Sequence, residues 1–414
     1  MTEEKAFRRW IVVIGAVVIQ LALGTIYTWG VMTIYVSPYL GIPRELTVFI
    51  FGVGLLAFGL TMIFAGQLQQ RIGPIKATII GGIILAVGVM SSAAMTSLIG
   101  LIMTYGVLFG IGIGICYVCP IATAQKWYPD KKGFISGIAV AGFGAGAFIF
   151  NYAISALAVL SIPIMFIILG AIYVTMILGG ALTLKLPPAD FRPAGWTPPP
   201  PRTGISSGAS LNRNETVKTK SFWMLWLMFV LSAISGLLVI GSFAAFAKLT
   251  DPALNPLYVI SATDFVLLGG IAALFNGLGR IVWGKIADST SYKKTMLMMF
   301  SLQGVLMVIY FYSNVSIPMF MALTCMIYFC FGGNFSLVPT ATTDLFGLKN
   351  VGANYGVVFS AYGIAGFIGA TMVPSFYAFF GSYLFLFVTM GIMSFAAAVL
   401  TFVLKPPKVE GSIK

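Results

Sequence analysis

The stretches GQLQQRIGPIK at residues 66–76 and GKIADSTSYKK at residues 284–294 decide how this chain is organised. Each follows a long apolar run, begins with glycine and carries basic residues, and the two lie 218 positions apart. A second pair, PIAT at 120–123 and PTAT at 339–342, recurs at an offset of 219. Two independent pairs at nearly one offset indicate an internal duplication. The alternative is chance similarity between glycine-rich polar loops.

The apolar runs around these stretches are long enough to cross a membrane. Of the 414 residues, 59% are hydrophobic and only 8% are charged, whereas a soluble domain carries about 25% charged residues. A transmembrane helix needs about 20 mainly apolar residues. The sequence therefore predicts an all-α integral membrane protein with twelve spans, at residues 10–38, 47–70, 77–96, 98–124, 133–159, 163–185, 222–248, 262–284, 294–313, 317–343, 351–380 and 383–404.

A polar segment divides the twelve spans into two sets of six. Residues 186–221 are rich in Pro, Gly, Ser and charge, so they cannot span a bilayer and are expected to form a cytoplasmic linker. The expected units are a six-helix bundle at 1–185, the linker, and a second six-helix bundle at 222–414. Parallel six-helix repeats suit a transporter whose site lies between the halves and opens to each side alternately.

The distribution of charge predicts the orientation in the membrane. The formal net charge is +13, and 21 of the 24 basic residues fall on one side when both termini are placed in the cytoplasm. Cytoplasmic loops carry such an excess of Lys and Arg. We therefore expect a multi-pass protein of a bacterial inner membrane with cytoplasmic termini. The net positive charge is then explained by the orientation in the membrane and by contact with anionic lipid. We therefore expect no nucleic-acid partner.

The sequence lacks the residues that several classes of function require. The chain has no His, and its four Cys lie inside apolar runs, where small apolar packing explains the C-x-x-C at 116–119 better than redox chemistry does. No nucleophile–base pair, carboxylate dyad or metal cluster stands out in the spans. We expect no enzyme activity, no metal or organic cofactor, and no obligate protein partner. A receptor or channel fits poorly with the duplicated six-helix pattern.

Arg280 is the candidate substrate-binding residue. It lies eight residues before Asp288, which places it about 12 Å inside the end of its span at a rise of 1.5 Å per residue. A charge there is costly and requires a partner, yet no Asp or Glu lies deep in any span. An anionic substrate is the natural partner, because a guanidinium matches a carboxylate with two parallel donors. The alternative is that Arg280 reaches the surface or pairs with a backbone carbonyl.

Asn276 shares a helical face with Arg280, four residues earlier. Its amide either binds a hydroxyl or carboxylate of the substrate or holds Arg280 in place. The sequence does not separate these two roles.

The pattern G-x-L-x-x-R-x-G at 66–73, with its second copy, resembles the signature of the major facilitator superfamily, with Gln70 where that family usually has Asp. The segments KWYPDKKG at 126–133 and GTIYTW at 24–29 resemble the branch of monocarboxylate transporters and oxalate:formate antiporters. The resemblance covers nearly the whole chain. It implies the twelve-helix major facilitator fold with two six-helix repeats, and a substrate carboxylate held by the Arg of helix 8, which falls on Arg280.

Three departures from the branch bear on charge. Animal monocarboxylate transporters have an Asp, implicated in proton coupling, where this chain has Asn276, and a Lys where it has Val31. The oxalate:formate antiporter has a second cation where this chain has Tyr362. A single cation suits a single carboxylate, because a dianion would bring a second buried charge without a partner. A monoanion is therefore expected.

The resemblance also implies the walls of the site. Tyr117 matches a substrate-site Tyr of the oxalate carrier, while that carrier has Tyr or Trp at the positions of Phe143, Phe331, Phe335 and Phe359. An apolar wall beside one cation fits a short acid with a methyl tail, although each Phe has ordinary helix packing as its alternative. The resulting hypothesis is a symporter of L-lactate and protons by alternating access, in which Asn276, Tyr117 and Tyr362 select the hydroxyl end. The alternative is an organic-anion exchanger without proton coupling.

Overall fold

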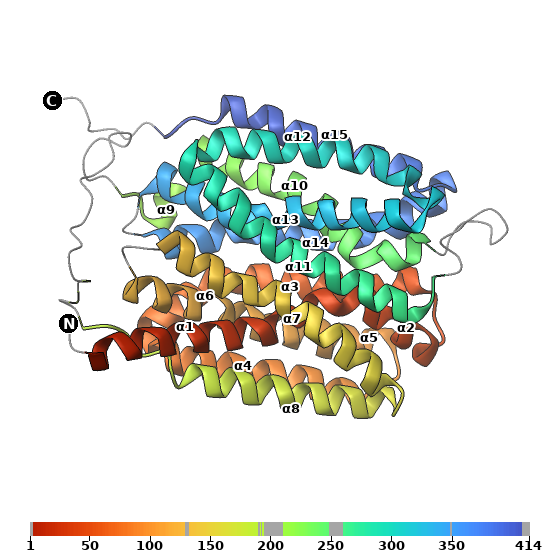
Figure 1. Cartoon of the computed structure of the whole chain (residues 1–414), viewed down its shortest axis with the longest axis horizontal. Helices are drawn as coiled ribbons and strands as arrows, with labels where there is room; N and C mark the ends of the chain where they lie inside the picture. Colours follow the sequence, from red (N-terminus) through yellow and green to blue (C-terminus); the bar gives the residue numbers. More distant parts are fainter. Residues whose placement is uncertain are drawn as a thin grey trace.

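A computed structural model describes residues 3–128, 132–188, 191, 193, 210–247, 260–347 and 350–407. Within these ranges the chain is helical, and twelve helical segments are long and apolar enough to cross a membrane. This arrangement confirms the twelve predicted spans. The red-to-yellow helices of the first half lie together on one side of the bundle, and the green-to-blue helices of the second half lie on the other (Figure 1).

The first half contains six spans built from eight α-helices, with three short 3-10 or π segments that continue them. Its helices are α1 (Glu3–Leu23), α2 (Trp29–Leu40), α3 (Arg44–Ile72), α4 (Pro74–Ser91), α5 (Leu98–Leu101), α6 (Phe109–Trp127), α7 (Lys132–Ala158) and α8 (Ile162–Ala181). The second half begins after the short helix α9 (Arg213–Thr216) and contains α10 (Lys220–Ala247), α11 (Ala262–Ser289), α12 (Tyr292–Tyr310), α13 (Ile317–Phe346), α14 (Val351–Phe380) and α15 (Leu384–Val403). The first turn of α1, helix α9 and the last turn of α15 lie at one end of the bundle (Figure 1).

Two of the predicted spans are interrupted within their length by a segment that is not α-helical. The first is interrupted between α1 and α2 by a 3-10 segment, Gly24–Thr28, in which the Thr28 hydroxyl donates to the backbone oxygen of Thr25. The fourth contains a π-helical segment, Ile102–Leu108, between α5 and α6. A wider or tighter turn changes which face each side chain occupies, and such segments are frequent at functional sites.

The two halves meet mainly along two helix pairs, α3 with α14 and α7 with α11. Glycine permits both contacts. A Cβ on Gly59 of α3 would lie 2.7 Å from the Cα of Gly363 of α14, and a Cβ on Gly144 of α7 would lie 2.7 Å from the backbone oxygen of Ala273 of α11. Small residues let membrane helices approach closely enough for backbone contact. The α7–α11 contact brings the backbone of α7 against the turn of α11 that carries Arg280.

Candidate functional site

Arg280 is enclosed between the two halves of the bundle. Its side chain is only 2% exposed, so it does not reach the surface. Nη1 donates to the backbone oxygen of Val140 on α7 at 3.2 Å. The guanidinium carbon lies 4.2 Å from the ring centroid of Phe335 and 5.4 Å from that of Phe143. A desolvated cation over an aromatic face gains about 2 kcal/mol, so neutral groups offset part of the cost of burying this charge.

Asn276 holds Arg280 in the observed geometry. Its Oδ1 accepts a hydrogen bond from the guanidinium Nε at 3.1 Å, while its Nδ2 donates to the backbone oxygen of Tyr328 at 3.3 Å. Both ends of the amide are thus engaged by the protein, one by α11 itself and one by α13. Of the two roles that the sequence left open for Asn276, the contacts favour the positioning role.

The remaining nitrogen of the guanidinium is a donor without an acceptor. Nη2 of Arg280 is buried and has no hydrogen-bond partner among the described residues. A buried hydrogen-bonding group left unsatisfied costs about 1–3 kcal/mol, and more when the group is charged. The carboxylates of the described helices lie near helix ends, for example Asp264 in the first turn and Asp288 in the last turn of α11. The free donor is therefore available to an anion that the chain itself does not supply.

Seven aromatic side chains close a circuit around this site, which we call the aromatic cage. Neighbouring centroids lie 5.0 Å apart for Tyr27–Phe143, 5.7 Å for Phe143–Tyr117, 5.4 Å for Tyr117–Phe359, 5.0 Å for Phe359–Tyr362, 5.4 Å for Tyr362–Phe335, 5.4 Å for Phe335–Phe331 and 6.0 Å for Phe331–Tyr27. All seven side chains are buried. The cage contains every aromatic residue that was predicted from the sequence to line the site. Two of its members, Phe143 and Phe335, contact Arg280.

Both halves contribute to the cage, and a hydrogen bond joins them. Tyr27, Tyr117 and Phe143 come from the first half, and the other four members come from α13 and α14 of the second half. The Tyr362 hydroxyl donates to the Tyr27 hydroxyl at 3.0 Å. The hydroxyls of Tyr27 and Tyr117 also lie close to the Arg280 guanidinium, although neither gives Nη2 a hydrogen bond of good geometry. Separating the halves therefore opens the cage and exposes the guanidinium.

Tyr27 is a candidate that sequence reasoning missed. It lies in the 3-10 segment between α1 and α2, where the helical spacing that relates side chains to a common face does not hold. Phe58 and Phe229 were also missed; both pack behind the cage, with ring centroids 5.6 Å and 6.3 Å from that of Tyr362. The sequence does contain a signal for Tyr27, because this residue lies within GTIYTW, the segment that resembles a particular branch of the family.

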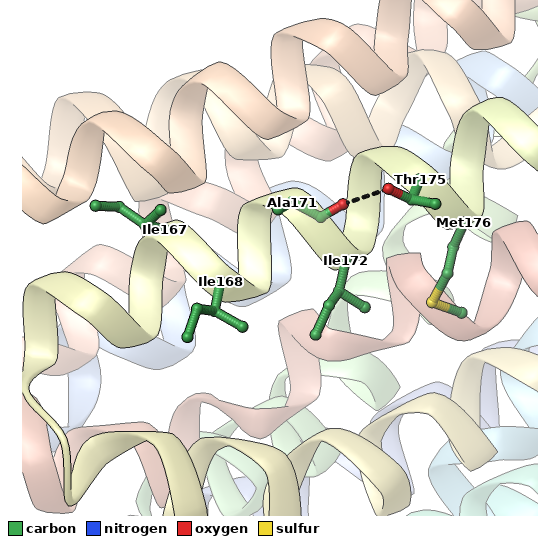
Figure 2. Close-up of a pocket in the computed structure, with 6 residues that line it drawn as sticks. All are labelled: Ile167, Ile168, Ala171, Ile172, Thr175 and Met176. Atoms are coloured by element: carbon green, nitrogen blue, oxygen red, sulfur yellow. Dashed lines mark hydrogen bonds between the residues drawn. The ribbon is translucent and has the colours of Figure 1, made fainter.

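A depression on the outside of α8 is a poor candidate for a substrate site. Figure 2 shows that its six lining residues, Ile167, Ile168, Ala171, Ile172, Thr175 and Met176, all come from one helix. The hydroxyl of Thr175 donates to the backbone oxygen of Ala171 at 2.8 Å, so the polar group of the depression is already paired (Figure 2). Ile167 and Ile172 are partly exposed on the outer surface of the bundle. This apolar, shallow surface suits lipid rather than an anion.

No described residues offer an evident metal site, because no three His, Cys, Asp or Glu side chains gather among them. The four Cys are buried and unpaired, and Cys116 and Cys119 donate to the backbone oxygens of Thr78 and Ile115. These contacts agree with a packing role for the C-x-x-C.

Comparison with known proteins identifies the family. The model of the Major Facilitator Superfamily matches residues 12–250 and 236–414. The chain is 32% identical to the uncharacterized MFS-type transporter YhjX of Escherichia coli (strain K12), over 86% of this chain and 85% of that protein. It is 26% identical to apicoplast pyruvate carrier 1 of Toxoplasma gondii, over 87% and 82% of the two chains. It is also 26% identical to the oxalate:formate antiporter of Oxalobacter formigenes, over 96% and 91%. The chain is therefore a transporter, not an enzyme, and it belongs to the Major Facilitator Superfamily.

Proposed function

We propose that this protein carries a small monocarboxylate across the membrane by alternating access, with the carboxylate bound to Arg280. The observation that supports this most directly is the buried Nη2, a charged donor with no partner in the described chain. A carboxylate at that position would accept a charge-assisted hydrogen bond, and charge-assisted bonds are roughly twice as strong as neutral ones. Displacing the Val140 oxygen from Nη1 would free a second parallel donor for the other carboxylate oxygen.

The cage favours a short, mostly apolar tail on that carboxylate. Phe143, Phe331, Phe335 and Phe359 present hydrocarbon, whereas the hydroxyls of the cage belong to its three Tyr residues. The second cation that the oxalate:formate antiporter branch carries is replaced here by Tyr362. L-lactate fits this combination, because it brings one negative charge, one hydroxyl and one methyl group. The relatives named as carriers of pyruvate and as an antiporter of oxalate and formate are in keeping with small organic anions as the substrate class.

We further propose that a proton accompanies L-lactate, as the family branch suggests. Among the described residues, the groups that face the site are Tyr hydroxyls and a guanidinium, and none of them is a carboxylate. A proton taken up near neutral pH must then travel with the substrate rather than on a protein carboxylate. That same observation favours a second candidate, electroneutral exchange of one monoanion for another, because exchange needs no proton acceptor.

Orientation is also part of the proposal. The excess of Lys and Arg on one side of the twelve spans supports a bacterial inner-membrane protein with both termini in the cytoplasm. The linker proposed at residues 186–221, between the two six-helix bundles, would then lie on the cytoplasmic side; residues 189–190, 192 and 194–209 of it lie outside the part of the chain that the structure describes.

Transport by the purified protein in liposomes tests these proposals. Uptake of radiolabelled L-lactate is measured with an imposed pH gradient and, separately, into liposomes preloaded with unlabelled lactate at equal pH. Uptake driven by an acidic exterior supports symport, and uptake that requires preloading and ignores the gradient supports exchange. Oxalate uptake in preference to lactate would overturn the monocarboxylate proposal.

A further inference from the structure

One wall of the aromatic cage is backed by a residue without a side chain. Gly236 of α10 lies directly behind Phe331 of α13, and neither residue is exposed. A Cβ built on Gly236 would lie 2.4 Å from Cδ2, 2.5 Å from Cγ and 2.6 Å from Cβ of Phe331. Carbon atoms in optimal contact are about 3.5–4.0 Å apart. The position of the Phe331 ring therefore depends on the absence of a methyl group at residue 236.

Rotation of the ring cannot create room for that methyl group. Turning Phe331 about its χ1 bond moves the ring atoms but leaves its Cβ in place, still 2.6 Å away. Helix α13 would have to shift away from α10 by about 1 Å to restore a normal contact. On its other side, α13 already touches α11, because a Cβ on Gly332 would lie 2.1 Å from the backbone oxygen of Asn276. The helix is confined between α10 and the turn that carries the binding residues.

A displaced Phe331 ring would press on other members of the cage. Its other ring neighbours are Tyr27, Phe335 and Tyr362, at centroid distances of 6.0, 5.4 and 6.4 Å. All three belong to the cage. A methyl group at residue 236 would thus narrow the space in which the tail of a substrate is enclosed.

We propose that Gly236 is a specificity-determining residue, which sets the length of the substrate tail by letting Phe331 lie back from the centre of the cage. This inference rests on the proposed function of the cage as the tail-binding site. A larger residue at 236 shortens the accepted tail, and a smaller residue at 331 lengthens it. The pair acts on size alone, since neither residue contacts the charge of Arg280 through a polar group.

Binding to the purified full-length protein provides the test. Dissociation constants are measured by ligand-induced thermal shift for straight-chain monocarboxylates from formate to valerate and for dicarboxylates from oxalate to glutarate. The variants are Gly236→Ala and Phe331→Ala. One methylene in an apolar pocket changes binding by about tenfold or more when it no longer fits. Gly236→Ala is expected to weaken propionate relative to acetate by at least that factor, and Phe331→Ala to strengthen each longer acid by about fourfold per methylene.

Gly304→Ala is the matched control. A Cβ on Gly304 of α12 would lie 2.9 Å from the tip of the Phe395 ring on α15, so Gly304→Ala also crowds a Phe of a neighbouring helix, but away from the cage. It is expected to leave the order of affinities unchanged. If Gly304→Ala changes that order as well, or if both cage variants keep the wild-type order, Gly236 is a packing residue only and the proposal is wrong. If Gly236→Ala aggregates, the Phe331→Ala variant provides the test. An affinity for the longer acids that is no higher than that of the wild type then overturns the proposal.

The two ligand series separate this inference from the proposed function. If the wild-type protein is stabilised by dicarboxylates alone, the monocarboxylate proposal is wrong. The effect of Gly236 can still be tested in that case, because the variants can be compared for the length of the dicarboxylate that each binds most tightly. If the wild-type protein binds neither series of acids, both proposals are wrong.

Discussion

Replacing Arg280 separates the contribution of its charge from that of its shape. Arg280→Lys keeps the charge but loses the planar set of donors in which Nε is bound by Asn276, Nη1 by Val140, and Nη2 is free. A hydrogen bond to a charged group contributes about 1.5–3 kcal/mol, and each 1.36 kcal/mol is tenfold in rate. Arg280→Lys should therefore lower kcat/KM for L-lactate by about tenfold to a hundredfold. Arg280→Gln removes the charge too, and a loss of about a thousandfold or more is expected.

Initial rates of radiolabelled L-lactate uptake into proteoliposomes, over a range of concentrations, give kcat/KM for each variant. Lys220→Gln serves as the control, because it removes a positive charge from an exposed residue at the start of α10. Its kcat/KM should stay within about twofold of wild type, since exposed charges act weakly through salt solution. Wild-type uptake by a folded Arg280→Gln protein would refute the assignment of the carboxylate to Arg280.

Three further changes test the surroundings of the site. Tyr27→Phe leaves the buried Tyr362 hydroxyl without its acceptor, so kcat/KM should fall by about tenfold; an unchanged value would mean that this bond has no role in transport. Asn276→Asp places a carboxylate beside Arg280 that the guanidinium keeps ionised near neutral pH and that competes with the substrate, so kcat/KM at pH 7 should fall by at least about tenfold; a wild-type value would contradict the contact between the two residues. Gly59→Val blocks the approach of α3 to α14, so uptake should fall by at least about tenfold while binding measured by thermal shift is retained; equal losses of both would indicate misfolding instead of a blocked movement.

The spans and the central charge were accessible from sequence because both depend on the cost of polar groups in a bilayer. Long apolar runs have few alternatives to membrane helices, and this principle located all twelve segments. The same principle drew attention to Arg280, since a charge so far from the helix ends needs a reason. The aromatic candidates came from the family resemblance, because a helical pattern cannot separate Phe331 in the cage from a Phe in ordinary packing.

Other features depended on contacts between residues far apart in the chain. The hydroxyl of Thr25 bonds to that of Tyr173, 148 positions away, next to the break that places Tyr27 in the cage. The role of Asn276 depends on a backbone oxygen of α13, which no local pattern specifies. The closeness of Gly236 to Phe331 likewise arises only when α10 and α13 pack together. Sequence periodicity reports which face of a helix is apolar, but not which atoms that face meets.

The neutral environment of Arg280 has a consequence for how the transporter senses voltage. The empty site holds one positive charge shielded by Asn276, a carbonyl oxygen and two rings, whereas the site with a bound monoanion is neutral. A charge that experiences the whole membrane field gains about 2.3 kcal/mol per 100 mV. A potential that is negative inside therefore favours the inward-facing form of the empty protein. It leaves unaffected a form loaded with the monoanion alone, whereas a form that also carries the proposed proton has the same net charge as the empty protein and responds in the same way. Exchange of monoanions is then insensitive to the membrane potential at each loaded step. Symport with one proton moves the same charge in both directions and is insensitive to the potential over the whole cycle.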